Sequence, residues 1–203
     1  MTKILIFFLF AINPNLTSQD IIINSFDDHK IHGSLLKHKK SKSDLVVIIP
    51  GSGPTDRNGN NSSIKSDYLK LLSQELYKYK ISSFRYDKRG VAESLGNIKL
   101  ANEIKFQDFV KDVKEIIKYF RQSNHYNSIT LIGHSEGSLI GMIASQKSDV
   151  DKFVSIAGAG EDYLTVIQRQ LSNQPPYIKS MSDPIIEQLR NKKLVDSIPP
   201  LLN

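Results

Sequence analysis

The chain has 203 residues, a length that fits one domain with a sizeable hydrophobic core. It contains no Cys, which excludes disulfides, thiolate metal sites, a Cys nucleophile and a lipid-modified Cys. Its 27 Lys and Arg against 21 Asp and Glu give a net charge of +6, which is too modest and too evenly interspersed to indicate nucleic-acid binding.

The first 18 residues have the features of a secretory signal peptide. Lys3 precedes nine apolar residues, Ile4 to Ile12, and a polar stretch that ends in the small residue Ser18. Nine residues span only about 14 Å as a helix, so no membrane anchor is expected once the segment is removed. We therefore expect a secreted or periplasmic protein whose mature chain begins at Gln19; a buried N-terminal strand is the alternative.

Predicted strands alternate with predicted helices along the mature chain. Residues 21–23 and 31–36 flank a turn at 27–30, which predicts two strands. The later elements are expected in this order: a strand at 45–49, a helix at 67–79, a strand at 81–86, a helix at 104–120, a strand at 128–132, a helix at 138–144 and a strand at 152–157.

The run Leu45 to Ile49 is apolar at every position, which is typical of a strand buried between two layers of helices. Together with the alternation of elements, it predicts an α/β fold with a mostly parallel sheet flanked by helices and right-handed crossovers.

The pattern changes after Ala157. Amphipathic helices are predicted at 161–171 and 184–195, with Asp183 and Pro184 as the N-cap and first turn of the second. No further buried strand is predicted before Asn203. We therefore expect a core domain at 19–160 and a helical lid or cap at 161–203, with a terminal helical hairpin as the alternative.

The motif that carries chemistry is Gly133-His134-Ser135-Glu136-Gly137, which follows a predicted buried strand and precedes a predicted helix. A serine on such a sharp turn has a strained backbone and presents its hydroxyl above the sheet. Side chains two positions to either side would collide, so Gly133 and Gly137 are the expected elbow glycines. The setting predicts Ser135 as a nucleophile, with the positive end of the helix directed at the reaction centre; a structural turn serine is the alternative.

Acyl transfer also needs two backbone N–H groups that stabilise the developing oxyanion. One is expected from Glu136, which follows the nucleophile. The other is expected from the loop after the first core strand, where Ser52 is the first choice and Gly53 the alternative. This loop lacks the glycine-rich phosphate-binding motif, so phosphate binding is not indicated. No cluster of His, Asp and Glu has metal-ligand spacing, so neither a metal nor an organic cofactor is predicted.

Three motifs and the helical stretch after them resemble those of a known superfamily. They are Gly51 to Asn60 (GSGPTDRNGN), Arg85 to Gly90 (RYDKRG) and the elbow at 133–137. The chain resembles the α/β hydrolases, and within them the secreted EstD-type esterases related to the serine aminopeptidase-like group. The resemblance implies the α/β-hydrolase fold and a Ser–acid–His mechanism on carboxylic esters of small molecules, under a helical cap.

The second motif differs slightly from the family pattern, because many relatives have Gly where Ala92 stands. We expect Asp87 and Arg89 in this motif to hold the loop after the third core strand together rather than to catalyse.

In this fold the triad follows the chain order Ser, acid, His. None of the five histidines follows Ser135; they are His29, His32, His38, His125 and His134. The triad acid and His are therefore unassigned, and Glu161 or Asp162 as an alternative acid would still lack a base. We expect a chain truncated before the last two strands of the fold, or completed by a second chain, with little or no turnover by itself.

Two other functions stay open. A peptidase or aminopeptidase would act on short peptides and could hold the substrate amine with Glu161 or Asp162, although acids are also common at helix N-termini. A non-catalytic remnant of the fold would bind ligands without turnover. Comparing the hydrolysis of esters with that of peptides would distinguish an esterase from a peptidase. Reaction of Ser135 with an organophosphate would distinguish an enzyme from a non-catalytic binding protein.

Overall fold

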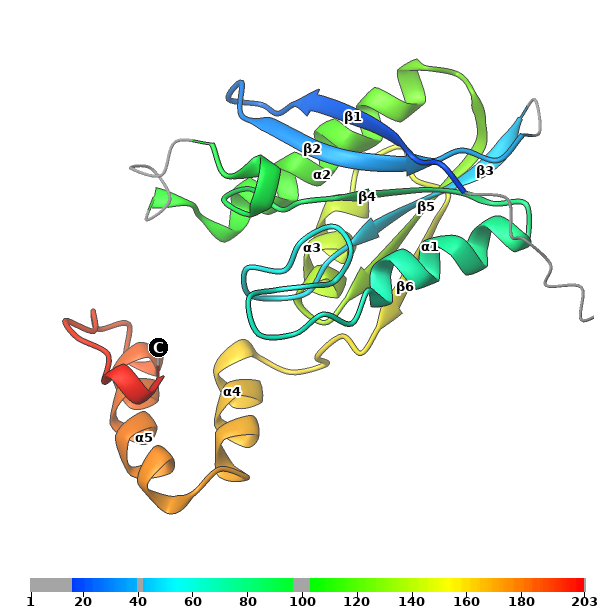
Figure 1. The fold of residues 1–203 in the computed structure, drawn as a ribbon. Coiled ribbons are helices and arrows are strands. Elements are labelled where there is room, and N and C mark those ends of the chain that lie inside the picture. The colour runs from blue at the N-terminus through cyan, green and yellow to red at the C-terminus, as the bar shows by residue number, and fades with distance from the viewer. Residues whose placement is uncertain (1–15, 40–41, 97–102, 203) are drawn as a thin grey trace, which may run out of the picture. The chain divides into compact units, whose positions relative to one another are not determined.

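The computed structural model describes residues 16–39, 42–96 and 103–202. It has two compact units, Met1–Ile156 and Ala157–Asn203, and each is described by itself (Figure 1). Residues 1–15, which form most of the predicted signal peptide, lie outside the described residues, so export stays a prediction.

A six-stranded mixed sheet forms the first unit. Its strands are β1 (Gln19–Asn24), β2 (Lys30–Leu36), β3 (Ser43–Ile49), β4 (Ser82–Tyr86), β5 (Tyr126–His134) and β6 (Lys152–Ile156). Their order in the sheet is β1-β2-β4-β3-β5-β6. β3 pairs in parallel with β4 and β5, and β5 in parallel with β6, whereas β2 pairs antiparallel with β1 and β4. The parallel strands therefore bring their carboxyl ends to one edge of the sheet.

Helices cover both faces of this sheet. α1 (Tyr68–Lys78) packs on one face, and α2 (Phe106–Gln122) and α3 (Glu136–Ser145) pack on the other (Figure 1). A short 3-10 helix, η1 (Ala92–Ser94), follows β4. The mostly parallel sheet flanked by helices is confirmed, with the β1–β2 hairpin as its antiparallel part.

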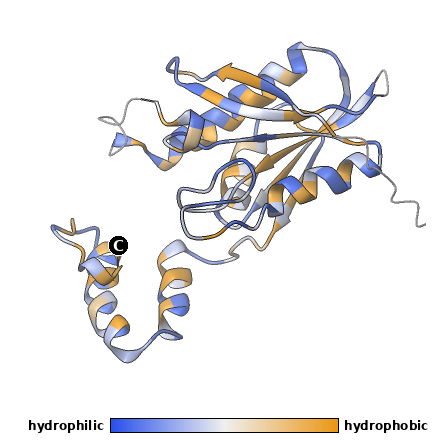
Figure 2. Ribbon diagram, in the orientation of Figure 1, coloured by the Kyte–Doolittle hydropathy of each residue, from blue (hydrophilic) through white to orange (hydrophobic). Residues whose placement is uncertain are grey.

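β3 shows why the sequence has an unbroken apolar run in this region. Leu45, Val47 and Ile49 belong to the core cluster with α2 and α3, whereas Val46 and Ile48 belong to the cluster with α1. Both faces of the strand are thus buried, as its composition predicts. Figure 2 shows these central strands as the hydrophobic centre of the unit.

The second unit consists of α4 (Tyr163–Ser172), α5 (Pro176–Arg190) and a short 3-10 helix, η3 (Pro200–Leu202). An apolar groove of about 430 Å³ lies among these three elements. The chain therefore contains a helical hairpin here, and its role as a lid stays a prediction. Among the described residues, no helix is long and apolar enough to cross a membrane.

The predicted bounds of the last helix were wrong. α5 begins eight residues earlier than Pro184, which lies inside the helix, and ends at Arg190. The physical reason is that Pro176 takes the first helical position, where its fixed φ and missing N–H cost little. Asp183 is not a cap: its carboxylate pairs with Lys179 one turn earlier.

Candidate active site

Ser135 occupies the turn between β5 and α3, at the carboxyl edge of the parallel strands. It is the N-cap residue of α3 and has φ 53° and ψ −118°, a region that non-glycine residues seldom adopt. Its own N–H donates to the Ile156 carbonyl over 2.9 Å, which ties the turn to the end of β6. This is the strained strand-to-helix geometry that presents a hydroxyl above a sheet.

The two glycines of the motif lie where backbone segments approach each other closely. A Cβ on Gly133 would lie 2.2 Å from the Gly137 carbonyl oxygen. A Cβ on Gly137 would lie 2.4 Å from the Ile49 oxygen and 2.5 Å from that of Pro50. Because the obstacles are backbone atoms, α3 reaches β3 and the loop after it only if both residues are glycine.

The loop after β3 lies directly against the elbow. A Cβ on Gly51 would be 3.3 Å from the Ser135 Cβ. Ser52 and Gly53 follow and are exposed, and Gly53 has φ 75° with open space around its Cα. Within the described residues, no protein group accepts the N–H of Ser52 or of Glu136. Two unpaired N–H groups therefore flank the serine, as an oxyanion site requires.

Lys88 has no role predicted from the sequence, but it lies beside both oxyanion candidates in the structure. Its Nζ donates to the Gly51 carbonyl oxygen over 2.6 Å and to Glu136 Oε2 over 3.0 Å. Its side chain is 4% exposed, and Nζ lies 5.2 Å from the centre of the Phe109 ring. The sequence signal that could indicate it is its position two residues after β4, whose carboxyl end lies beside that of β3.

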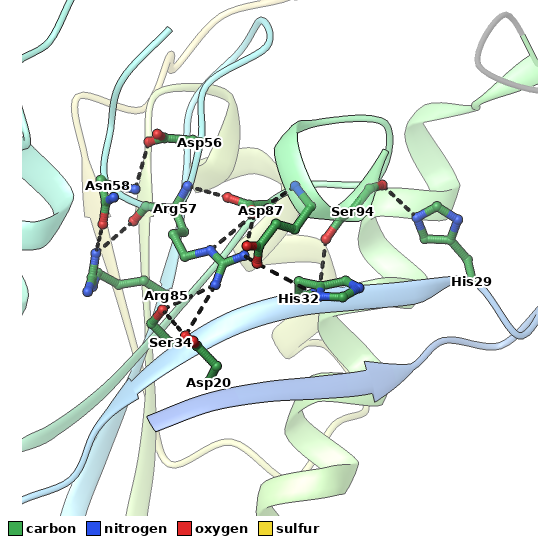
Figure 3. A network of polar contacts seen from close by, with 11 residues as sticks. Asp20, His29, His32, Ser34, Asp56, Arg57, Asn58, Arg85, Asp87 and Ser94 are labelled. Atoms are coloured by element: carbon green, nitrogen blue, oxygen red, sulfur yellow. Dashed lines mark hydrogen bonds and ion pairs between the residues drawn. The ribbon is translucent and has the colours of Figure 1, made fainter. Parts of the chain in front are cut away.

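Arg57 fixes the loop after β3 to the loop after β4 (Figure 3). Its backbone N–H donates to Asp87 Oδ1 over 2.7 Å, and its guanidinium donates to Asp87 Oδ2 over 3.0 and 2.6 Å. The guanidinium also pairs with Glu93. Burial lowers the pKa of Arg57, but the hydrogen bonds to Asp87 and Glu93 outweigh burial and raise that pKa above its ordinary value.

The rest of the motif Gly51 to Asn60 stabilises the loop internally. Asp56 Oδ1 accepts the N–H groups of Asn58 and Asn60, each over 2.8 Å. Arg85 Nη1 donates to the Arg57 carbonyl over 3.2 Å and also bonds the Asn58 side chain (Figure 3). Hydrogen bonds within the most distinctive motif of the sequence, and from Arg85, therefore hold the loop after β3 in its conformation.

Arg89 joins the loop after β4 to α2 and to the turn between β1 and β2. It is bonded to the buried Asp112 of α2 over 2.6 and 3.1 Å, and to Asp27 of the β1–β2 turn over 2.6 and 2.9 Å. The hydrogen bond from Arg89 lowers the pKa of Asp27. The prediction that Asp87 and Arg89 hold the loop together is confirmed.

The histidines of the described residues are placed away from the Ser135 hydroxyl or bound elsewhere. His134 Nδ1 lies 3.2 Å from the Tyr68 hydroxyl, and burial raises the pKa of that hydroxyl. His125 is exposed at the amino end of the nine-residue β5, about 30 Å of strand from the elbow. The other three lie on or beside β2: His29 contacts the Ser94 carbonyl, His32 lies near Glu93, and the ring of His38 contacts the tilted ring of Tyr77. No described side chain hydrogen-bonds to Ser135 Oγ.

The two acids after β6 are engaged within the second unit. Asp162 caps α4 by accepting the Thr165 N–H over 3.0 Å, and this hydrogen-bonding to Thr165 lowers its pKa. Glu161 pairs with Arg169. The first contact is that of an ordinary N-cap residue, and the second is an exposed ion pair. Within the described residues, no group of three or more His, Cys, Asp and Glu could hold a metal ion.

Comparison with solved structures finds several hydrolases of similar fold. The α/β hydrolase GrgF from Penicillium sp. sh18 has a TM-score of 0.61 and 16% identity, and the match covers 89% of this chain and 57% of that one. The esterase Pf2001 from Pyrococcus furiosus has a TM-score of 0.62 and 18% identity, and the match covers 85% of this chain and 61% of that one. XC6422 from Xanthomonas campestris, described as a serine hydrolase without lid, has a TM-score of 0.54 and 15% identity. The match covers 74% of this chain and 66% of that one.

At these identities the likeness shows the fold alone, and the chain spans 57–66% of the length of these three proteins. No curated protein sequence matches the chain. The family model of the serine aminopeptidases S33 (Hydrolase_4) matches residues 63–197, which include the elbow and the loop after β4. The chain has the α/β-hydrolase fold and belongs to the serine aminopeptidase S33 family.

Proposed function

We propose that this protein hydrolyses carboxylic esters of small molecules with Ser135 as its nucleophile. The observation that carries the proposal is the position of Ser135, held at φ 53° at the N-terminus of α3. Beside it lie two backbone N–H groups for which the described residues provide no acceptor. The esterase Pf2001 among the similar structures supports the choice of an ester substrate.

In the proposed reaction, Ser135 Oγ attacks the ester carbonyl carbon and its proton passes to a base. The carbonyl oxygen becomes negative and accepts hydrogen bonds from the Ser52 and Glu136 N–H groups, or from Gly53 in place of Ser52. The bond to the alcohol then breaks, and the alcohol leaves with a proton. Water attacks the acyl-serine and releases the carboxylic acid.

We propose that the base and its acid come from polypeptide outside these 203 residues, either further sequence or a second chain that completes the sheet beside β6. Two observations support this. No described side chain is bonded to Ser135 Oγ, and the hydrolases of similar fold are longer. Without a base, a serine hydroxyl is a poor nucleophile, so the chain alone should turn over slowly.

A peptidase is the second candidate, because the matching family is named for serine aminopeptidases. An aminopeptidase needs an acid that holds the substrate amine. The two acids considered for this role, Glu161 and Asp162, are paired with Arg169 and Thr165. We therefore place esters first.

Acylation of the purified 203-residue chain by p-nitrophenyl acetate tests the proposal. Imidazole, supplied in the buffer, replaces a missing base, and mass spectrometry of the digested protein locates the acetyl group. We expect imidazole-dependent acetylation of Ser135 that is absent in Ser135→Ala and unchanged in Ser145→Ala, at the far end of the same helix.

Absence of acetylation at Ser135 with imidazole present would overturn the nucleophile. Turnover without imidazole, lost in Ser135→Ala, would keep the nucleophile and overturn the proposal of an external base. Faster cleavage of an amino-acid p-nitroanilide than of the ester would favour the aminopeptidase.

A further inference from the structure

Lys88 is a buried lysine that the reaction proposed above does not use. Its side chain is 4% exposed, yet its ammonium group has three partners: the Gly51 carbonyl oxygen, Glu136 Oε2 and the face of Phe109. Burying a charge is costly unless it is paired and hydrogen-bonded. We therefore expect a lysine at this position to have a role other than packing.

Both polar partners belong to the two backbone segments that flank Ser135. The Gly51 carbonyl and the Ser52 N–H are the two ends of one peptide unit, and this unit is trans. In a trans peptide these two groups point in opposite directions. A hydrogen bond that fixes the carbonyl toward Lys88 therefore fixes the Ser52 N–H away from Lys88, on the exposed side of the loop.

The second partner joins the other oxyanion candidate to the same anchor. Glu136 is the first residue of α3, where backbone N–H groups have no partner within the helix. Its side chain accepts a hydrogen bond from Lys88 Nζ over 3.0 Å, while its own N–H pairs with no group in the described part of the chain. One ammonium group thus holds both the loop after β3 and the start of α3.

We infer that Lys88 is a positioning residue of the oxyanion site, which sets the direction and the spacing of the Ser52 and Glu136 N–H groups. The inference rests on the proposed function. Lys88 does not touch the reacting atoms and acts through two peptide units. A charged donor on the Gly51 oxygen also polarises that amide, which makes the Ser52 N–H a stronger donor toward a developing oxyanion.

The variant Lys88→Met tests this inference, because it keeps the aliphatic stem and removes all three donors. Lys118→Met, which removes an exposed lysine of α2 paired with Glu115, is the matched control. Two quantities are measured: the rate of Ser135 acetylation at saturating and subsaturating p-nitrophenyl acetate, with imidazole, and the ¹H–¹⁵N resonances of the Ser52 and Glu136 amides.

We expect Lys88→Met to lower the limiting acetylation rate at least about tenfold, since loss of a whole oxyanion donor costs about 10²–10³. The ester concentration for half-saturation should change little, because the oxyanion forms only in the transition state. The Ser52 amide proton should shift upfield as its peptide loses the charged partner. Lys118→Met should change neither quantity.

A second variant covers the case in which Lys88→Met does not fold. Glu136→Leu leaves the backbone N–H of residue 136 in place, so a loss of acetylation rate in this variant must arise from its side chain. We expect a several-fold loss, and an unchanged rate would overturn the inference. Where Lys88→Met folds, we expect its combination with Glu136→Leu to lose little more than Lys88→Met alone. Fully additive losses would show that the two side chains act separately and would overturn the inference.

The outcomes distinguish this inference from the proposed function. Acetylation of Ser135 in the wild type together with an unchanged rate and unchanged Ser52 resonance in folded Lys88→Met would overturn the inference and leave the nucleophile standing. Failure of the wild type to acetylate at Ser135 would overturn both.

Discussion

At the scale of single residues, Arg57 holds the loop after β3 in place. Its side chain is 10% exposed and that of its partner Asp87 is 2% exposed, and the pair joins two loops that are 30 residues apart. A buried carboxylate that loses its partner retains its desolvation cost. We therefore expect Arg57→Met to lower the free energy of unfolding by about 3–5 kcal/mol, as measured by urea denaturation.

Lys78→Met is the control, because Lys78 forms an exposed pair with Glu75 and such pairs contribute about 1 kcal/mol or less. Part of the lost stability should return in Arg57→Met combined with Asp87→Leu, because no unpaired charge is then buried and the side chain of Glu93, the other partner, is 65% exposed. Equal destabilisation by Arg57→Met and Lys78→Met would show that the buried network does not stabilise the loop.

The sequence indicates some of these residues and not others, for a physical reason. Ser135 is evident because the elbow needs a fixed local spacing of glycines around it. The motif around Arg57 is conspicuous, but its partner Asp87 is distant in the chain, so its structural purpose emerges only in three dimensions. Lys88 has no local signature, since both of its partners come from other segments.

At the scale of elements, the strands and helices of the first unit follow the predicted order because their apolar periodicity is clear. Helix ends are less certain, and α5 illustrates why. Two proline positions compete as its start, Pro176 and Pro184, and both satisfy local rules. Packing decides between them: Ile186 and Ser182 are buried along α5, which extends the helix in both directions from Asp183.

Asp151 joins three elements, and its contribution to stability should depend on pH. Its Oδ2 accepts the Ile129 N–H over 2.7 Å at the start of the buried part of β5, and it pairs with Arg121 near the end of α2. The hydrogen bond from Ile129, then the contacts with Arg121, lower the pKa of Asp151 below its ordinary value of 3.8.

Because the folded state lowers this pKa, the stabilisation is fully present above about 3.8 and is lost as the pH falls through the lower, folded value. Asp151→Asn removes the titrating group. The free energy of unfolding of the wild type should exceed that of Asp151→Asn at pH 7, and the difference should shrink toward zero in acid. Asp149→Asn, which contacts the same Arg121 without accepting a backbone N–H, is the control. A difference that is constant from pH 7 to acid would contradict the assignment.

At the scale of the whole molecule, the edge strand β6 of the first unit exposes apolar side chains. β6 pairs with β5, and within the described residues no strand pairs with its other side. Val154 and Ile156 of this strand are 42% and 39% exposed. The opposite edge strand, β1, also exposes one isoleucine, Ile22 at 53%, but it begins with the polar residues Gln19 and Asp20 and so has fewer exposed apolar side chains. An unpaired apolar strand edge is a template for association with another chain.

The purified chain should therefore associate through β6, and a charge on this strand should prevent it. Val154→Lys places an ammonium group on the edge strand, a device by which natural proteins block edge pairing. We expect sedimentation velocity to show concentration-dependent association of the wild type and a monomer for Val154→Lys, with unchanged circular dichroism. Leu139→Lys is the matched control, because Leu139 is also 42% exposed but lies on α3. If Leu139→Lys were monomeric while Val154→Lys still associated, the contact would lie on α3 rather than on the edge strand β6.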